Sequence, residues 1–245
     1  DLRMSRGLGD VYKRQHDNSA AFYDRDLVFS QLGFDTFTTK ESMNIKKWTE
    51  NGWAKDQILT GCIMDSLDST KGQDYVYCIS VQGHGDYPTT MPEGFIPGIT
   101  VSGFFDEEEQ VQFEYYVNQI HEMDTFIGEL TNMLSRRNEE TVLVMYGDHL
   151  PTFNFTNDTM ENGDIYQTEY FIWSNYGLEK KDIDLQAYQL SAAVFDRLGI
   201  SEGYIMKFHQ AKHNDADYLK KLKVLEYDIL YLSLIHISEP TRHAQ

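Results

Sequence analysis

The sequence predicts an α/β fold with a mainly parallel sheet flanked by helices. Two apolar runs, YVYCISV at 75–81 and TVLVMY at 141–146, are typical of strands that are covered on both faces. Between them, apolar residues recur at steps of three and four, which is typical of a long amphipathic helix. This alternation of strands and helices favours a parallel sheet over an antiparallel one.

The remaining elements follow in chain order. Near-helical apolar spacing precedes Gly33, which favours a helix stop, and residues 34–37 alternate between apolar and polar. Apolar residues at helical steps indicate the later helices, and another β-prone run indicates a third strand. The expected helices are 24–32, 56–67, 106–137 and 185–198, with a helical extension at 211–231, and the expected strands are 75–81, 141–146 and 169–173.

The composition is that of a folded globular protein. Of 245 residues, 41% are hydrophobic and 13% aromatic, so one domain can bury a substantial core. The formal net charge of −18 disfavours binding to nucleic acid or to an anionic lipid surface through a basic patch. An anionic substrate would therefore need a local arginine or a metal to offset the acidic field.

Cysteines and apolar runs place further limits on the chain. Cys62 and Cys78 are not part of a CxxC motif, so we expect two buried thiols, with a disulfide left open as the alternative. No apolar run approaches the roughly 20 residues that cross a bilayer. No signal peptide opens the chain, and we expect the chain itself to be soluble.

Both ends of the chain are expected to lie outside the natural domain. Residues 1–15 (DLRMSRGLGDVYKRQ) and 232–245 (LSLIHISEPTRHAQ) carry no periodicity that joins them to their neighbours. Both resemble translated sequencing-adapter read-through, and the alternative is a disordered natural tail. Such segments are excluded from fold reasoning. We therefore expect one folded domain at residues 16–231, truncated at its N-terminus.

Polar residues follow both apolar runs, where an open α/β sheet binds its ligands. Gly147, Asp148 and His149 come directly after TVLVMY. A carboxylate beside an imidazole is a plausible half of a site for Mn²⁺ or Zn²⁺, and the alternative is a structural or solvated pair.

A histidine follows the other apolar run. His84 is flanked by Gly83 and Gly85, which leave the backbone open to close ligand approach. Its imidazole could donate to a phosphate oxygen or protonate a leaving group. The alternative is a turn histidine that is hydrogen-bonded to nearby backbone.

An aromatic and basic cluster opens the first expected helix. Arg25 offers a planar, always charged fork for phosphate, and Tyr23 could stack beside it. The alternative is that Arg25 pairs with Asp24 or Asp26.

Three segments together resemble one family. YGDH at 146–149, the Gly-His loop around His84 and FYDRD at 22–26 are similar to the lipoteichoic acid synthase branch of the sulfatase/alkaline phosphatase superfamily, and the resemblance covers 16–231. It implies an alkaline-phosphatase/sulfatase-like fold and a partial catalytic domain. Enzymes of this branch are anchored in the bacterial membrane, face outward, and move glycerol phosphate from phosphatidylglycerol to a growing polymer through a phospho-threonine.

The resemblance also implies roles for individual residues. Asp148 and His149 match metal ligands, usually for manganese, with Mg²⁺ or Zn²⁺ as alternatives. His84 matches the histidine that acts on the substrate phosphate, Arg25 matches the arginine that grips glycerol phosphate, and Tyr23 stands where Trp is common.

The same resemblance implies that part of the site is missing. A glutamate ligand and the nucleophilic threonine would lie upstream of His16, so we expect weak metal binding and no turnover from this chain alone. The implied partners are an anionic phospholipid headgroup and a glycerol phosphate polymer, with no nucleic acid. The alternatives are a sulfatase, phosphoethanolamine transferase or phosphodiesterase of the same superfamily, or a non-catalytic extracellular binding domain.

Overall fold

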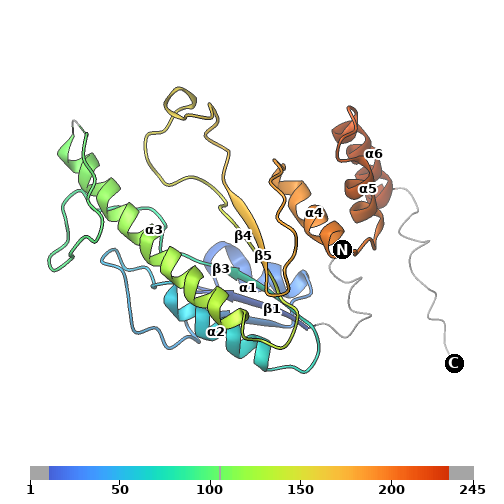
Figure 1. The fold of residues 1–245 in the computed structure, drawn as a ribbon, viewed down its shortest axis with the longest axis horizontal. Coiled ribbons are helices and arrows are strands. Elements are labelled where there is room, and N and C mark those ends of the chain that lie inside the picture. The colour runs from blue at the N-terminus through green and yellow to red at the C-terminus, as the bar shows by residue number, and fades with distance from the viewer. Residues whose placement is uncertain (1–10, 105, 232–245) are drawn as a thin grey trace. The chain divides into compact units, whose positions relative to one another are not determined.

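The computed structural model describes residues 11–104 and 106–231 (Figure 1). The chain divides into two compact units, with the boundary between Glu179 and Lys180. The expected single domain at 16–231 therefore contains an internal boundary, and each unit is described by itself. Residues 1–10 and 232–245 of the expected tails lie outside the described residues.

The first unit contains a parallel sheet with the strand order β2-β1-β3. It is formed by β1 (Val11–His16), β2 (Thr36–Thr39) and β3 (Asp74–Ile79). His16 lies opposite both Thr39 and Ile79, so the three carboxyl ends are level. The predicted mainly parallel sheet with flanking helices is confirmed.

The central strand corrects the expected start of the folded segment at His16. Residues 11–15 form most of β1, although their sequence, VYKRQ, has no apolar run. Long-range partners stabilise the buried polar side chains: Lys13 forms an ion pair with Asp74 at 2.8 Å, and Gln15 donates to the carbonyl of Cys62 at 2.5 Å. The strand is therefore held by contacts that are remote in sequence.

Helices cover both faces of this sheet. Arg14 points toward α1 (Arg25–Gln31), where its guanidinium lies over the ring of Phe29. Gln15 points the opposite way, toward α2 (Gln57–Asp68), where it also donates to Ser66 Oγ at 2.7 Å. Alternation along β1 thus sends successive side chains to opposite helical layers.

The apolar core lies between α2 and α3 (Glu107–Leu134) and extends to the strands (Figure 1). Its most buried members are Met43, Leu59, Ile63, Phe126, Leu130 and Leu134. Asp106 caps α3 by accepting from the backbone N–H groups of Glu108 and Glu109, as expected of an acidic helix start. Cys62 and Cys78 pack against the core as free thiols.

Two later strands form a separate antiparallel ribbon. β4 (Val142–Tyr146) pairs with β5 (Tyr170–Ser174), and the bounds of both strands agree with the predicted ones to within one residue. β4 is half-buried along most of its length and exposed at Tyr146, so its apolar run does not mark a strand sealed on both faces. The hydroxyl groups of Tyr77 and Tyr146 are 2.9 Å apart, which joins β3 to the end of β4.

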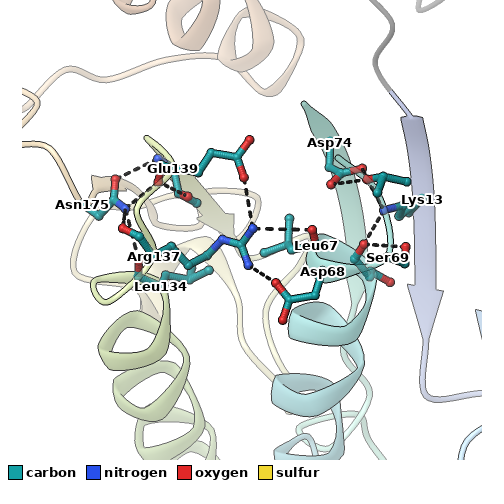
Figure 2. A network of polar contacts seen from close by, with 12 residues as sticks. Lys13, Leu67, Asp68, Ser69, Asp74, Leu134, Arg137, Glu139 and Asn175 are labelled. Atoms are coloured by element: carbon teal, nitrogen blue, oxygen red, sulfur yellow. Dashed lines mark hydrogen bonds and ion pairs between the residues drawn. The ribbon is translucent and has the colours of Figure 1, made fainter. Parts of the chain in front are cut away.

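A polar network ties these elements together near the amino ends of β3 and β4 (Figure 2). Arg137, just after α3, donates to Asp68 at 2.6 Å and to Glu139 at 3.0 Å. Asn175, just after β5, donates to the carbonyl groups of Leu134 and Glu139. The opposite, carboxyl edge of the parallel sheet remains for a ligand site.

The second unit is helical over its described part. It contains α4 (Leu190–Arg197), α5 (Tyr204–Lys212) and α6 (Tyr218–Tyr231). Gly199 follows α4 with φ +70°, which confirms the predicted stop. Across residues 11–104 and 106–231, no helix is both long enough and apolar enough to cross a bilayer.

Candidate functional site

Arg25 is held at the carboxyl edge of the parallel sheet by a histidine. His16, the last residue of β1, is 2% exposed, and its Nδ1 lies 3.0 Å from the carbonyl oxygen of Ile79 on β3. Its Nε2 lies 2.6 Å from Arg25 Nη1. Because a guanidinium only donates, Nδ1–H donates to Ile79 and the Nε2 lone pair accepts from Arg25.

Electrostatics favours this arrangement. Burial, and then the positive charges of Arg25 and Arg14, lower the pKa of His16 to about 4 against the opposing effect of its Ile79 hydrogen bond. His16 is therefore neutral near pH 7 and can accept from Arg25 without adding a second positive charge.

Two aromatic rings flank the same arginine. The guanidinium carbon of Arg25 lies 5.3 Å from the ring centroid of Tyr23 and 5.5 Å from that of Phe22. Tyr23 is 76% exposed and has φ +59°, and Asp24 has φ +50°. A bulky residue with positive φ is an outlier, and such residues cluster at functional sites.

Arg25 does not pair with the acidic residues beside it in the sequence. Within the described residues it forms no ion pair with Asp24 or Asp26, and its hydrogen-bond partner is His16. His16 was not predicted as a site residue, although it lies at the carboxyl end of a β-strand, the kind of position that indicated His84 and Asp148. The strand before His16 was not recognised because its buried residues are polar.

His84 lies in an exposed turn after β3. Its backbone N–H donates to the carbonyl of Val81 at 2.9 Å, and its ring centroid is 5.0 Å from that of Trp53. Trp53 Nε1 also donates to the carbonyl of Gly85 at 3.2 Å. Trp53 therefore holds the turn in place, while the His84 imidazole stays accessible to a ligand.

Asp148 and His149 lie exposed after β4 and point toward each other. Asp148 Oδ1 accepts from the backbone N–H of His149 at 2.9 Å and lies 3.7 Å from His149 Nε2. His149 Nδ1 is 2.7 Å from the carbonyl oxygen of Leu150, so Nδ1 carries the proton and Nε2 presents its lone pair. A metal-ligating histidine typically donates its other ring N–H to an oxygen in this way.

The donor set therefore fits a divalent cation in part. A carboxylate oxygen and an imidazole nitrogen converge at Asp148 and His149. Among the described residues, no group of three or more His, Cys, Asp or Glu side chains is arranged to hold a metal. The pair can supply two ligands, and the others must come from elsewhere.

Packing joins the His84 turn to the segment after Asp148 and His149. The rings of Tyr87 and Phe153 stack at 4.9 Å, and Phe153 stacks on Phe113 of α3 at 3.8 Å. A Cβ atom placed on Gly85 would lie 2.8 Å from Thr152 Oγ1, so this close approach requires glycine. The two strand-end loops are thus neighbours.

The predicted site residues fall into three groups. Arg25 and Tyr23 belong with His16, His84 lies in the turn after β3, and Asp148 lies beside His149 after β4. The Ile79 contact joins the first group to β3, and loop packing joins the second to the third. Within the described residues, no hydrogen bond or ion pair directly connects the three groups.

Comparison with protein families gives one match that covers most of the chain. The sequence profile described as Sulfatase matches residues 5–218. A protein of Rhizobium meliloti (strain 1021), named for cyclic beta-1,2-glucan modification, is 26% identical over 221 residues. That match covers 83% of this chain and 34% of the relative, so the chain spans about a third of its length.

Solved structures with the same fold include phosphate-ester enzymes. The Streptococcus pyogenes phosphoglycerol transferase GacH, in complex with sn-glycerol-1-phosphate, has a TM-score of 0.77 at 24% identity, covering 90% of this chain and 61% of that one. The Listeria monocytogenes lipoteichoic acid synthase LtaP has a TM-score of 0.51 at 21% identity, covering 69% and 44%. An alkaline phosphatase superfamily protein from Vibrio parahaemolyticus has a TM-score of 0.51 at 15% identity. That match covers 82% of this chain and 47% of the other.

Proposed function

Because the chain belongs to the sulfatase family, we propose that its parent protein is a metal-dependent phosphoglycerol transferase. The donor would be a phosphatidylglycerol-type lipid, and the acceptor a glycerol phosphate polymer, as in lipoteichoic acid synthesis. The observation that carries the proposal is Arg25, held by a neutral His16 at the carboxyl edge of the parallel sheet, where the His84 turn after β3 packs against the segment that follows the Asp148–His149 pair.

Each group has a place in this chemistry. Arg25 grips the phosphate with its charged fork, and Tyr23, whose ring lies beside that guanidinium, contacts the glycerol. His84, exposed and flanked by glycines, donates to a phosphate oxygen or protonates the leaving alkoxide. Asp148 and His149 would hold a divalent cation, Mn²⁺ by preference or Mg²⁺ or Zn²⁺, which would neutralise phosphate charge and lower the pKa of the nucleophile.

The remaining parts of the machinery are assigned to the parent protein. We place the nucleophilic threonine and a glutamate metal ligand upstream of the described residues, so the chain by itself should bind metal weakly and not turn over. The parent would be anchored at the outer face of a bacterial membrane. These assignments are supported by the phosphoglycerol transferase fold and by the partial coverage of the matched proteins.

The decisive experiment uses the parent protein with its upstream half. We expect Mn²⁺-dependent conversion of a fluorescent phosphatidylglycerol to diacylglycerol. Asp148→Ala and His149→Ala should each lower this activity by more than about 100-fold, since even groups that only orient a ligand contribute 10- to 100-fold.

A matched control is available on α3. His121 is exposed and has no role in the proposed site, so His121→Ala should retain wild-type activity and metal dependence. Full activity in Asp148→Ala or His149→Ala would remove the metal assignment. Hydrolysis of a sulfate ester in place of phosphatidylglycerol would favour a sulfatase instead.

A second acceptor has its own support. The Rhizobium meliloti relative is named for modification of a cyclic glucan, which favours a carbohydrate hydroxyl as acceptor. The donor and the site residues would be unchanged. Incubating the parent protein with phosphatidylglycerol and either acceptor, followed by mass analysis, distinguishes glycerol phosphate added to a polymer from glycerol phosphate added to a glucan.

A further inference from the structure

Two carboxyl groups are completely buried beside the proposed phosphate site, and the chemistry above does not use them. Asp17 follows His16 at the end of β1 and is 1% exposed, while Asp56 precedes α2 and is 0% exposed. Asp17 lies on the α2 side of the sheet, where its charge acts on Cys62. The pair therefore sits behind the ligand-facing edge.

Asp56 fixes the chain that leads into the His84 turn. Its Oδ1 accepts from the backbone N–H groups of Val81 and Gln82 at 3.2 Å each, and its own N–H donates to Gln82 Oε1 at 2.8 Å. In the described part of the chain, Asp56 Oδ2 and both oxygens of Asp17 meet no conventional donor. The two carboxyl groups lie close enough that each acts on the pKa of the other.

Within residues 11–104 and 106–231, neither carboxyl group forms an ion pair with a lysine or an arginine. The titratable groups that face the pair from the packed elements are His16 on β1, Cys62 on α2, Cys78 on β3 and Glu122 on α3. His16 Nδ1 is 3.8 Å from Asp17 Oδ1, but its proton is directed at Ile79 and its ring is neutral. Two buried carboxylates in contact cannot both be ionised without a counter-charge.

We propose that Asp17 and Asp56 share one proton, and that this carboxyl–carboxylate hydrogen bond is the positioning link between the His16–Arg25 arm and the His84 turn. Protonated Asp17 donates, and ionised Asp56 accepts from it and from Val81 and Gln82. The role in substrate positioning rests on the proposed function, whereas the shared proton does not.

The shared proton makes stability depend on pH in a defined direction. Burial, and then the charge of Asp56, raise the pKa of Asp17 to about 10, against an ordinary value of 3.8 in the unfolded chain. The contribution of this proton to stability is therefore fully present below the pKa of the unfolded chain. It is lost as the pH rises toward the pKa of the folded chain. Between these values the folded state holds one more proton, so the unfolding constant rises about tenfold per pH unit.

The first test measures this proton in the chain as it stands. Urea unfolding is followed from about pH 7 to about pH 9, above the titration of His16. Asp17→Asn keeps the size and a donor N–H but cannot titrate. The logarithm of the unfolding constant is plotted against pH for each protein. We expect the slope for Asp17→Asn to be lower than that for wild type by about one.

A control variant and two contrary results complete the unfolding test. Asp65→Asn, an exposed aspartate on α2, should keep the wild-type slope. Equal slopes in wild type and Asp17→Asn would overturn the shared proton, and so would a loss of wild-type stability on adding EDTA, which would indicate a buried cation. If Asp17→Asn fails to fold, a protonated-carboxyl infrared band in wild type at about pH 8 decides the question.

The second test addresses positioning. Binding of sn-glycerol-1-phosphate to the chain is measured for wild type, Asp17→Asn and Asp17→Ala. We expect Asp17→Ala to bind at least several-fold more weakly and Asp17→Asn to restore wild-type affinity with a flatter pH profile. Equal affinity in all three would overturn the positioning role. No binding by wild type would instead contradict the proposed function and leave the unfolding test intact.

Discussion

At the residue scale, the site depends on a histidine that must remain neutral. His16 can accept from Arg25 only while Nε2 is unprotonated, and burial lowers its pKa to about 4. A protonated ring would lose this acceptor and place a second positive charge against the guanidinium. The arginine is therefore oriented by a neutral partner, which leaves its full charge for a phosphate.

Stability should record this neutrality as a pH effect. The unfolded chain binds a proton at His16 near pH 6.5, while the folded chain does so only near pH 4, so this group makes stability fall as pH drops between these values. In His16→Gln that contribution is absent, and the ratio of unfolding constants between variant and wild type should change by up to about tenfold per pH unit. Urea titrations across this range measure the ratio. His213→Gln, an exposed change, should leave it constant, and a constant ratio in His16→Gln would contradict the neutral assignment.

Tyr23 predicts a separation of stability from binding. Because Tyr23 has φ +59° and is 76% exposed, Tyr23→Gly should cost the fold little or stabilise it, whereas removing the ring should weaken binding of glycerol phosphate several-fold. Thermal unfolding and ligand titration measure the two effects. Tyr166→Gly, which is 84% exposed and has no positive φ, should destabilise by about 0.5–1 kcal/mol and leave binding unchanged. A large loss of stability in Tyr23→Gly would contradict the assignment of strain.

The site residues were predictable from sequence to the extent that their positions were local. His84, Asp148 and His149 each follow an apolar strand, so the pattern indicated that they lie in loops at strand ends. The partner of Arg25 was not predictable, because adjacent acids competed for the assignment and His16 is nine residues away at the end of an unrecognised strand. Tertiary contacts, not nearest neighbours, determine that hydrogen bond.

At the element scale, the same distinction explains which parts of the fold were predicted. α3, β3 and β4 carry their own apolar patterns and lie where expected. β1 does not, because its inward-facing residues are satisfied by partners on other elements, such as Asp74 and Ser66. A strand stabilised by remote polar contacts has no local signature in its own sequence.

The close approach of two strand-end loops gives a prediction at this scale. Gly85→Ala would place Cβ 2.8 Å from Thr152 Oγ1, so the His84 turn should shift and phosphatidylglycerol cleavage by the parent should fall at least about tenfold. Removing the hydroxyl in Gly85→Ala/Thr152→Ala relieves the contact and should restore most of the activity. Gly128→Ala on α3 meets no atom within 4 Å and should have no effect on cleavage. Additive losses in the double variant would show that the two loops do not meet.

At the scale of the whole molecule, charge and site act in opposite directions. The formal net charge is −18, so the chain repels a phosphate ester at long range, while Arg25 attracts it at contact. The Debye length falls from about 30 Å at 0.01 M salt to about 8 Å at 0.15 M. Added salt therefore screens the distant acidic groups much more than a hydrogen-bonded pair a few ångströms apart.

Binding of an anionic ligand should accordingly strengthen with salt over a limited range. We expect the dissociation constant for sn-glycerol-1-phosphate to fall by about two- to threefold as NaCl rises from about 10 mM to about 150 mM, because the lost long-range repulsion outweighs the small weakening at contact. Titration calorimetry measures this change, and glycerol itself should show no salt dependence because it is uncharged. A dissociation constant that rises steadily with salt would mean that local cations dominate even at long range. In that case the acidic surface would lie on faces remote from the ligand, and the repulsion between protein and phosphate would have no role in recognition.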